Sequence, residues 1–334
     1  MKIHIFGFKG ESSIPTMAYS PWLTLLAILK ESGHEIIGRN KICDATLCIF
    51  NTVEKKDLEL CNQKNVPIKN RVLILWEPPA TNPKIYDKGL YEKFGLIFTP
   101  SNQWISNSRT LYFYWPQVKA DFIEKTALDE RIKRIVFIGA NKISFHLTEL
   151  YSLRRGILEE DRNNLIDVYG MGWSSNYSYK LKTLIGTVLK ASQKSISLKS
   201  IFDYFRTKVT NPKGVCVDKY QISERYRFAL VVENSRDYVS EKLFDALFSK
   251  CICFYIGPDL KNFGFPPELA IELHGEPKDI LIELQKHLDD SGIDTLLSIQ
   301  KKQQEAFEHL NIKNNNIKVF SDLAMQINHY GSSI

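Results

Sequence analysis

The first half of the chain alternates short apolar runs with amphipathic stretches. An apolar run of roughly 4–8 residues between turn residues is typical of a strand buried on both faces, whereas apolar residues three or four positions apart predict a helix. The pattern predicts one helix over residues 22–32, which ends near Gly33. Strands are predicted at 2–8, 45–50, 71–76, 95–99 and 110–114. This alternation favours a parallel sheet covered by helices.

The same pattern restarts after a charged stretch, residues 119–133. The predicted elements that follow are strands at 134–138, 166–169, 227–232 and 251–256 and helices at 148–160, 240–249, 299–310 and 319–329. We therefore expect an α/β chain with two Rossmann-like domains, 1–128 and 129–300, followed by C-terminal helices over 301–334. Ligands of open α/β sheets bind beyond the carboxyl ends of the strands, so the expected site is a cleft between the two domains.

Composition agrees with this organisation and narrows the class of protein. The 334 residues suit two domains of about 150 residues each. A hydrophobic content of 44% excludes a disordered chain. There is no signal-peptide pattern at the start and no run of about 18 apolar residues, so no transmembrane helix is predicted.

The six cysteines show no metal-binding spacing, and the apolar surroundings of Cys251 and Cys253 favour buried, reduced thiols. A cytoplasmic location is expected.

The charge of the chain is concentrated in one segment. Its 44 basic and 38 acidic residues give a net charge of +6. Residues 174–213 alone hold eight basic residues and one acidic residue, a net +7, so the other 294 residues sum to −1. Leucine, isoleucine, valine and phenylalanine are interleaved with these charges. Two interpretations stay open: a basic amphipathic surface that lies on the anionic inner face of a membrane, or a helix pair whose lysines are simply solvated.

One segment carries a specific motif. Residues 226–258 read YRFALVVENSRDYVSEKLFDALFSKCICFYIGP. This closely resembles the signature of the family-ten fucosyltransferases, in which an aromatic-basic-Phe strand ends in Glu-Asn-Ser/Thr and is followed by Asp-Tyr, a Thr/Ser-Glu-Lys helix start, a strand and a glycine. Two weaker matches lie upstream, at 75–79 (LWEPP) and at 168–170 (VYG), the latter preceded by a helix that holds Arg154. The resemblance covers residues 70–275 loosely.

The sequence departs from the family pattern at several points. The loop between Asn234 and Tyr238 is about two residues shorter than usual, and Glu77 is followed by proline where serine or asparagine is more typical. Residues 174–213 look like an insertion, and the C-terminal heptad repeats of some bacterial members are absent. These departures bear mainly on the identity of the acceptor.

The resemblance implies a fold and a reaction. The family has two Rossmann-like domains in the GT-B arrangement, binds GDP-fucose and transfers L-fucose with inversion at the anomeric carbon. For this chain it implies a cytoplasmic enzyme of bacterial type, an α1,3-type linkage, and an oligosaccharide or lipid-linked glycan acceptor such as a lipopolysaccharide precursor. An acceptor on a lipid would suit peripheral association of residues 174–213 with the inner face of the membrane.

The resemblance also implies which residues bind the donor. Lys242 is in the first turn of the helix begun by Ser240, where its charge and the helix dipole both favour a phosphate. Arg154 offers a planar guanidinium to phosphate oxygens, although the adjacent Arg155 competes for that role. The carboxylate of Glu241 suits the two ribose hydroxyls. By resemblance alone, two further residues line the nucleotide pocket, Asn234 and Tyr238.

Inversion in a single displacement needs one general base for the acceptor hydroxyl. Glu77 is the candidate, because it follows a predicted strand and the two prolines after it hold the backbone extended. The alternative is an exposed glutamate at a strand corner. Glu233 is either a second functional carboxylate or a structural acceptor of backbone N–H groups.

The histidines and tryptophans give only weak indications of a functional role. The seven histidines show no metal-binding spacing, and only His146 precedes the Arg154 helix closely enough to approach a diphosphate. We expect no metal site and no required cofactor, with the effect of a divalent ion left open. Trp104, Trp115 and Trp173 lie in predicted loops and either stack on sugar rings or pack in the core.

Three alternative functions stay open. The same scaffold can use another GDP-sugar. The basic segment suggests a nucleic-acid-binding protein, a different class, but no helix-turn-helix, RRM, KH or zinc-finger pattern supports it, and we expect no nucleic-acid partner. A lectin-like relative without activity would lack the base or the phosphate-binding cations, and candidates for both are present.

Overall fold

The computed structural model describes residues 1–7, 20–101, 109–113, 126–174, 177–190, 196–290, 292–310 and 312–333. For residues 20–22, 88, 290 and 312–318 it describes the backbone only. Trp104, Trp115, Lys194 and much of the charged stretch 119–133 lie outside these residues. The chain forms two units: domain 1 comprises Met1–Gln117 and Lys313–Ile334, and domain 2 comprises Val118–Ile312.

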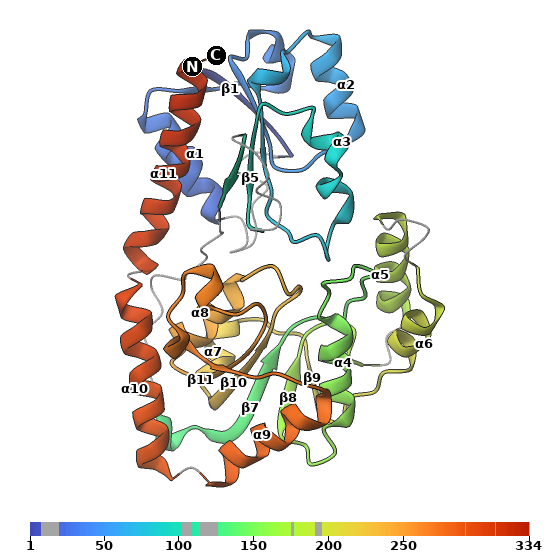
Figure 1. Ribbon diagram of the computed structural model, residues 1–334, viewed down its shortest axis with the longest axis vertical. Coiled ribbons are helices and arrows are strands. Elements are labelled where there is room, and N and C mark those ends of the chain that lie inside the picture. The colour runs from blue at the N-terminus through green and yellow to red at the C-terminus, as the bar shows by residue number, and fades with distance from the viewer. Residues whose placement is uncertain are drawn as a thin grey trace. The chain divides into compact units, whose positions relative to one another are not determined.

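Domain 1, whose first strands and helices are blue and whose α11 is red in Figure 1, contains a six-stranded, all-parallel sheet in the order β2-β1-β3-β4-β5-β6. The strands are β1 (Lys2–Phe6), β2 (Glu35–Ile36), β3 (Leu47–Phe50), β4 (Arg71–Ile74), β5 (Leu96–Thr99) and β6 (Thr110–Tyr112). The helices are α1 (Ser20–Glu31), α2 (Lys55–Gln63), α3 (Lys88–Tyr91) and α11 (Ile312–Ser333). The strands read as continuous apolar runs because both faces of the sheet are covered, one by α1 and α11 and the other by α2 and α3.

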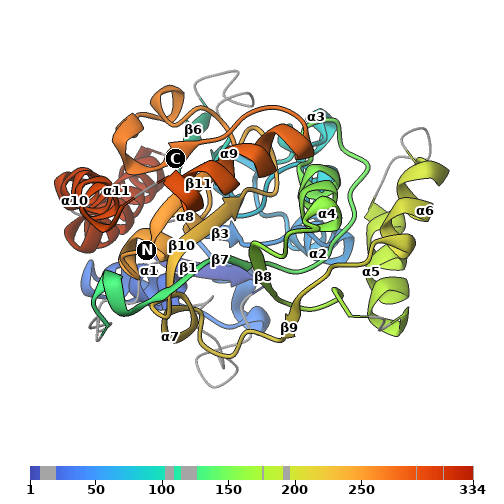
Figure 2. The same ribbon diagram turned by 90° about the horizontal axis from the view of Figure 1, so that it is seen from below.

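Domain 2 repeats this architecture with the strand order β12-β11-β10-β7-β8-β9, again all parallel (Figure 2). The strands are β7 (Ile132–Ile138), β8 (Ile166–Tyr169), β9 (Pro212–Gly214), β10 (Tyr226–Val232), β11 (Ile252–Ile256) and β12 (Ile271–Glu272). The helices are α4 (Tyr151–Glu160), α5 (Tyr177–Lys190), α6 (Leu198–Arg206), α7 (Lys219–Ser223), α8 (Glu241–Phe248), α9 (Pro277–Asp290) and α10 (Ile293–His309). The α4 and α9 helices pack on one face, and α8 packs on the other.

The last helix returns to the first domain, and the boundaries therefore differ from those expected at 128 and 300. Phe320, Leu323 and Ile327 of α11 are buried in the core of domain 1, whereas α10 packs within domain 2. Tyr330 donates a hydrogen bond to the carbonyl of Lys69 at 2.7 Å. Gly95 is required at this contact, because a Cβ there would collide with the Tyr330 hydroxyl and the Lys69 backbone. Sequence periodicity finds the α11 helix but not the domain to which it belongs.

The prediction of an α/β chain with two Rossmann-like sheets is confirmed. Every predicted strand is present within a few residues, and the predicted helices at 22–32, 148–160 and 240–249 correspond to α1, α4 and α8. All six cysteines are free thiols, and Cys251 and Cys253 are buried as expected. No helix in the described ranges is long and apolar enough to cross a membrane.

Candidate active site

The carboxyl ends of the domain 2 strands gather most of the residues that the sequence singles out. Because the sheet is parallel, the loops after β7, β8, β10 and β11 leave it at one edge. Backbone hydrogen bonds join these loops: Gly139 N–H donates to Tyr169 O at 2.9 Å and Glu233 N–H donates to Ile256 O at 2.8 Å. Gly170 has a φ of +137°, and a Cβ there would collide with the carbonyl of Gly139. The loops are thus held close together, and only glycine fits at their crossing.

The start of α8 is fixed by a buried carboxylate. Ser240 is the N-cap and accepts from Lys242 N–H at 3.4 Å. Glu233, whose side chain is fully buried, accepts from the Ser240 N–H at 2.8 Å and from the Ser240 hydroxyl at 2.6 Å. The Lys242 ammonium donates to the Ser240 hydroxyl at 2.8 Å and lies 3.4 Å from Glu233. Glu233 therefore has the contacts of a structural acceptor, which orients both the helix start and Lys242.

A pocket of about 240 Å³ lies beside this helix start, between the sheet and helices α7 and α8. Its apolar wall comes from β7 and β10, and its polar wall from Lys219, Glu241, Lys242 and Asp245. Binding pockets for whole ligands are usually larger, roughly 300–1,000 Å³, so this space suits one part of a nucleotide. The pocket brings two sequence-predicted residues together, Glu241 and Lys242, and adds Lys219 and Asp245, which sequence reasoning missed. Asp245 follows Glu241 by one helical turn, which is the signal that could have found it.

The charges around the pocket set the protonation of its two carboxyls. Burial acts to raise the pKa of Glu241, but the nearby ammonium groups of Lys242 and Lys219 outweigh it, and the pKa is lowered. Glu241 is therefore an ionised hydrogen-bond acceptor. Burial raises the pKa of Asp245 to about 6, even though Lys219 lies 2.5 Å from its carboxylate and the Tyr220 hydroxyl donates to it at 2.7 Å. The pocket thus holds one firmly ionised carboxylate and one that titrates near neutrality.

The raised pKa of Asp245 predicts that the free energy of unfolding depends on pH. Its pKa of about 6 in the folded chain exceeds the value of about 3.9 expected in the unfolded chain. Its contribution to stability is therefore fully present below about pH 4 and is lost as the pH rises through about 6. Relative to the Asp245→Asn variant, the free energy of unfolding of the wild type should fall by up to about 3 kcal/mol over that window. Urea denaturation across the pH range measures this difference, and a constant difference would contradict the assignment.

Arg154 lies at the same strand ends and is surrounded by oxygens of residues 140 and 232–234. The residue is 2% exposed. Its guanidinium donates to the Val232 carbonyl at 2.7 Å and to Ala140, Glu233 and Asn234 oxygens at 3.2–3.3 Å. It also sits over the rings of Phe137 and Tyr151. Burial lowers its pKa. Among the described atoms, its Nε has no hydrogen-bond acceptor. Arg154 thus ties β7 and β10 together and places a positive charge at their carboxyl ends; its contact with a diphosphate stays a prediction.

Arg155 points elsewhere. Its guanidinium donates to the Lys142 carbonyl at 2.5 Å and to the Ser152 hydroxyl at 3.0 Å, and lies 5.6 Å from the ring centre of Tyr204 in α6. Of the two adjacent arginines, the geometry therefore associates Arg154 with the strand ends that surround the pocket.

The remaining donor-binding candidates lie in the loop 233–240. Asn234 is half-buried, with its side-chain oxygen on Arg154 and its carbonyl accepting from Leu150 N–H at 3.1 Å. Tyr238 is 5% exposed. In the same loop, Ser235 lies 2.6 Å from the hydroxyl of Thr148, which in turn lies 2.9 Å from Nδ1 of His146.

His146 belongs to this network, and its approach to a diphosphate stays a prediction. Burial lowers its pKa, which the nearby carboxylate of Asp237 partly opposes. Within the described ranges, no group of three or more histidine, cysteine, aspartate and glutamate side chains is placed to hold a metal ion. Trp173 is 4% exposed, packs edge-on against Phe137 and donates to the Gly139 carbonyl, so it belongs to the core beneath these loops.

Glu77 is in domain 1, just beyond β4. Its side chain is exposed, whereas Pro78 and Pro79 are buried. The Tyr86 hydroxyl donates to the Glu77 carbonyl at 2.8 Å. The backbone of Glu77 is therefore held in place while its carboxylate is open to solvent, at the carboxyl edge of the domain 1 sheet.

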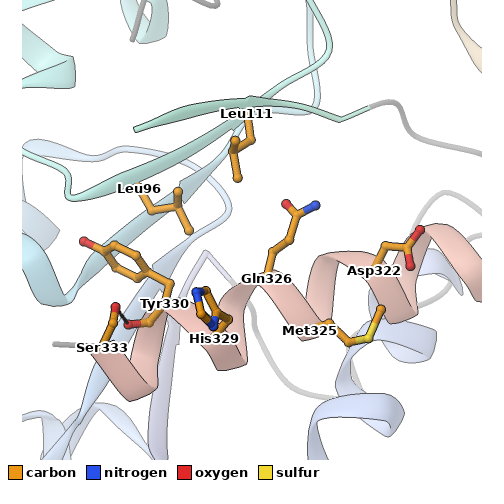
Figure 3. Close-up of a pocket in the computed structure, with 8 residues that line it drawn as sticks. All are labelled: Leu96, Leu111, Asp322, Met325, Gln326, His329, Tyr330 and Ser333. Atoms are coloured by element: carbon orange, nitrogen blue, oxygen red, sulfur yellow. Dashed lines mark hydrogen bonds between the residues drawn. The ribbon is translucent and has the colours of Figure 1, made fainter. Parts of the chain in front are cut away.

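Domain 1 also contains a hollow of about 540 Å³, between α11 and the β5–β6 edge of the sheet (Figure 3). Leu96 and Leu111 form one side, and Met325, His329 and Tyr330 of α11 form the other. Its lining includes the carboxylate of Asp322 but no lysine or arginine, so it lacks the facing carboxylates and ammonium groups of the domain 2 pocket.

These sheets and their connections define a class of fold: the chain has the GT-B fold, with two Rossmann-like domains. An α1,3-fucosyltransferase superposes on it with a TM-score of 0.55 and 14% identity, over 96% of this chain and 91% of that one. HepE of Anabaena, in complex with UDP and glucose, gives 0.57 and 11% over 100% of both chains. The DNA-modifying β-glucosyltransferase gives 0.54 and 11%, over 99% and 100%. No protein-family model matches the chain, and no curated protein is similar to it in sequence.

Proposed function

We propose that the chain is an inverting glycosyltransferase that moves L-fucose from GDP-fucose to a hydroxyl of a glycan acceptor. The observation that carries this proposal is the pairing of Glu241 and Lys242 at the wall of one pocket, at the carboxyl edge of a parallel sheet. The GT-B fold supports a sugar-nucleotide donor. The resemblance of residues 226–258 to the family-ten fucosyltransferases favours GDP-fucose over other donors.

The residues of domain 2 suit the departure of a nucleoside diphosphate. Glu241, held ionised, accepts hydrogen bonds from the two ribose hydroxyls. Lys242 stabilises the negative charge that develops on the β-phosphate as the bond to the sugar breaks, and the N-terminus of α8 adds its dipole. Arg154 contributes a positive charge that is fixed by carbonyls and needs no rearrangement when the charge develops.

Glu77 supplies the base in this proposal. Its carboxylate takes the proton from the acceptor hydroxyl as that oxygen attacks the anomeric carbon on the face opposite the leaving diphosphate. Inversion follows from this single displacement. The acceptor belongs to domain 1, and we propose an oligosaccharide or lipid-linked glycan. The proposal needs no cofactor, and assays with and without EDTA measure whether a divalent ion assists.

Donor binding tests the proposal. Calorimetry with GDP-fucose, GDP-mannose and UDP-glucose is expected to show GDP-fucose binding at least about tenfold more tightly than UDP-glucose, a difference of about 1.4 kcal/mol. Equal affinity for GDP-mannose would favour another GDP-sugar on the same scaffold. Tightest binding of UDP-glucose, the sugar nucleotide bound by HepE in a second structure, would contradict the donor assignment.

A further inference from the structure

Helices α5 and α6 form a pair that is attached to domain 2 by one face. Lys180 of α5 is 3% exposed and donates to the Phe205 and Thr207 carbonyls at 3.1 and 3.3 Å. The Thr187 hydroxyl donates to the Ile143 carbonyl at 3.2 Å. Tyr204 of α6 is fully buried. Figures 1 and 2 both show the pair side by side beyond β8 and β9. The Lys180 contacts join α5 to the end of α6, whereas the Thr187 contact and the buried Tyr204, whose hydroxyl donates to the Asn141 carbonyl at 3.4 Å, mark the sides that face the rest of the domain.

Another side of each helix exposes large apolar residues in a regular pattern. In α5 the exposed fractions are 64% for Tyr177 and 52% for both Leu181 and Ile185, at intervals of four residues. In α6 they are 81% for Leu198 and 63% for Phe202, again four residues apart. Residues at this interval lie on one face of a helix, so each helix presents an apolar stripe to solvent.

The two stripes join into one surface. The ring of Tyr177 stacks on that of Phe205 at 6.5 Å, with an angle of 9° between the planes. Tyr177 lies one turn before Leu181, and Phe205 lies one turn after Phe202. We call the combined face of these residues, together with Ile185 and Leu198, the hairpin surface.

Positive charges border the hairpin surface. Lys182, Lys199 and Arg206 are exposed and lie within about one turn of the apolar residues on their helices. The Arg206 guanidinium lies 5.7 Å from the ring centre of Phe202. Asp203 is the only acidic residue in 174–213, the segment with a net charge of +7. An exposed apolar face bordered by lysine and arginine is typical of a surface that lies on a charged membrane.

We propose that the hairpin surface docks on a bilayer that contains anionic phospholipids. The apolar side chains would enter the boundary between headgroups and acyl chains, and the bordering cations would contact phosphates. A second copy of the chain suits the surface poorly, because two segments 174–213, each with a net charge of +7, would repel each other. The docking is peripheral and independent of the proposed sugar transfer.

Co-sedimentation with vesicles tests the proposal. The wild type is expected to bind phosphatidylcholine vesicles that contain phosphatidylglycerol, and to bind pure phosphatidylcholine vesicles far more weakly. Each cation near an anionic surface contributes about fivefold to binding, so a triple Lys182→Gln, Lys199→Gln, Arg206→Gln variant should bind about 100-fold more weakly. A triple Leu181→Ser, Ile185→Ser, Phe202→Ser variant should lose the binding that persists in high salt.

A matched control variant also loses three positive charges, but outside α5 and α6. It combines Lys55→Gln, Lys261→Gln and Lys301→Gln, and all three lysines are exposed. It should bind as the wild type does, and thermal melts should show that every variant is folded. The proposal is overturned if the wild type does not sediment with anionic vesicles at low salt, or if the control loses as much binding as the hairpin variant. A dimer that the serine variant converts to a monomer, without vesicle binding, would also overturn it and assign the surface to self-association.

Discussion

Replacing Glu77 with glutamine is expected to slow sugar transfer about 1,000-fold while donor affinity stays within about twofold of the wild type. The substitution keeps the size of the side chain and the buried prolines that follow it, but it removes the group that accepts the proton. Steady-state kinetics with GDP-fucose and an accepted glycan give kcat, and calorimetry gives the affinity for GDP-fucose. A selective loss of kcat separates a base from a residue that binds the donor.

A matched control is available in the same domain. Glu31 is also exposed, but it ends α1 and therefore lies at the opposite, amino edge of the parallel sheet. The Glu31→Gln variant should retain full activity. Unchanged turnover of the Glu77→Gln variant would remove Glu77 from the mechanism and favour the alternative of an exposed glutamate at a strand corner.

Replacing Lys242 with methionine is expected to weaken GDP binding about 10- to 100-fold, because a hydrogen bond to a charged group contributes about 1.5–3 kcal/mol. The affinity for guanosine, which has no phosphate, should change little. Calorimetry with the two ligands makes the comparison within one variant. Comparing GDP with guanosine is necessary because Lys242 also contacts Glu233. A purely structural effect of the substitution would weaken the binding of both ligands alike.

Lys301→Met is the control for this prediction. Lys301 is 78% exposed on α10 of the same domain and pairs only with Glu305 one turn away among the contacts described. Its replacement should leave the affinity for GDP unchanged. Equal loss of guanosine and GDP binding in the Lys242→Met variant would contradict a direct contact with phosphate.

The sequence predicts nine of the twelve described strands, most of which are buried on both faces, and misses β2, β9 and β12, which are short, lie at sheet edges and are exposed or half-buried. Runs such as 72–76 and 251–256 consist of apolar and aromatic residues and cysteine, and helices cover both sides. The sequence does not predict the α2 helix, because Leu58, Leu60 and Cys61 are its only apolar residues and the other six are charged or polar. The position of α11 in domain 1 depends on contacts with strands more than 200 residues earlier, and local periodicity cannot report them.

In the candidate site, too, the sequence predicts the residues of a local motif but not the contacts between distant segments. The motif at 226–258 identified Glu241 and Lys242, which the structure places in one pocket. The motif gave no indication that Arg154 would be surrounded by carbonyls, since its partners come from residues 140 and 232–234. Lys219 and Asp245 were missed because their roles come from a pairing across two helices. Exposed apolar residues on α5 and α6 could be recognised only once their helices' buried faces were known.

The most direct test of the account is turnover of the donor panel, with product analysis. Wild-type protein incubated with GDP-fucose and candidate glycans should release GDP and form an α-linked fucoside, as read from the anomeric signal by NMR, while UDP-glucose and GDP-mannose should be left intact. Transfer from UDP-glucose without transfer from GDP-fucose, or a fucoside that retains the β configuration of the donor, would contradict the account.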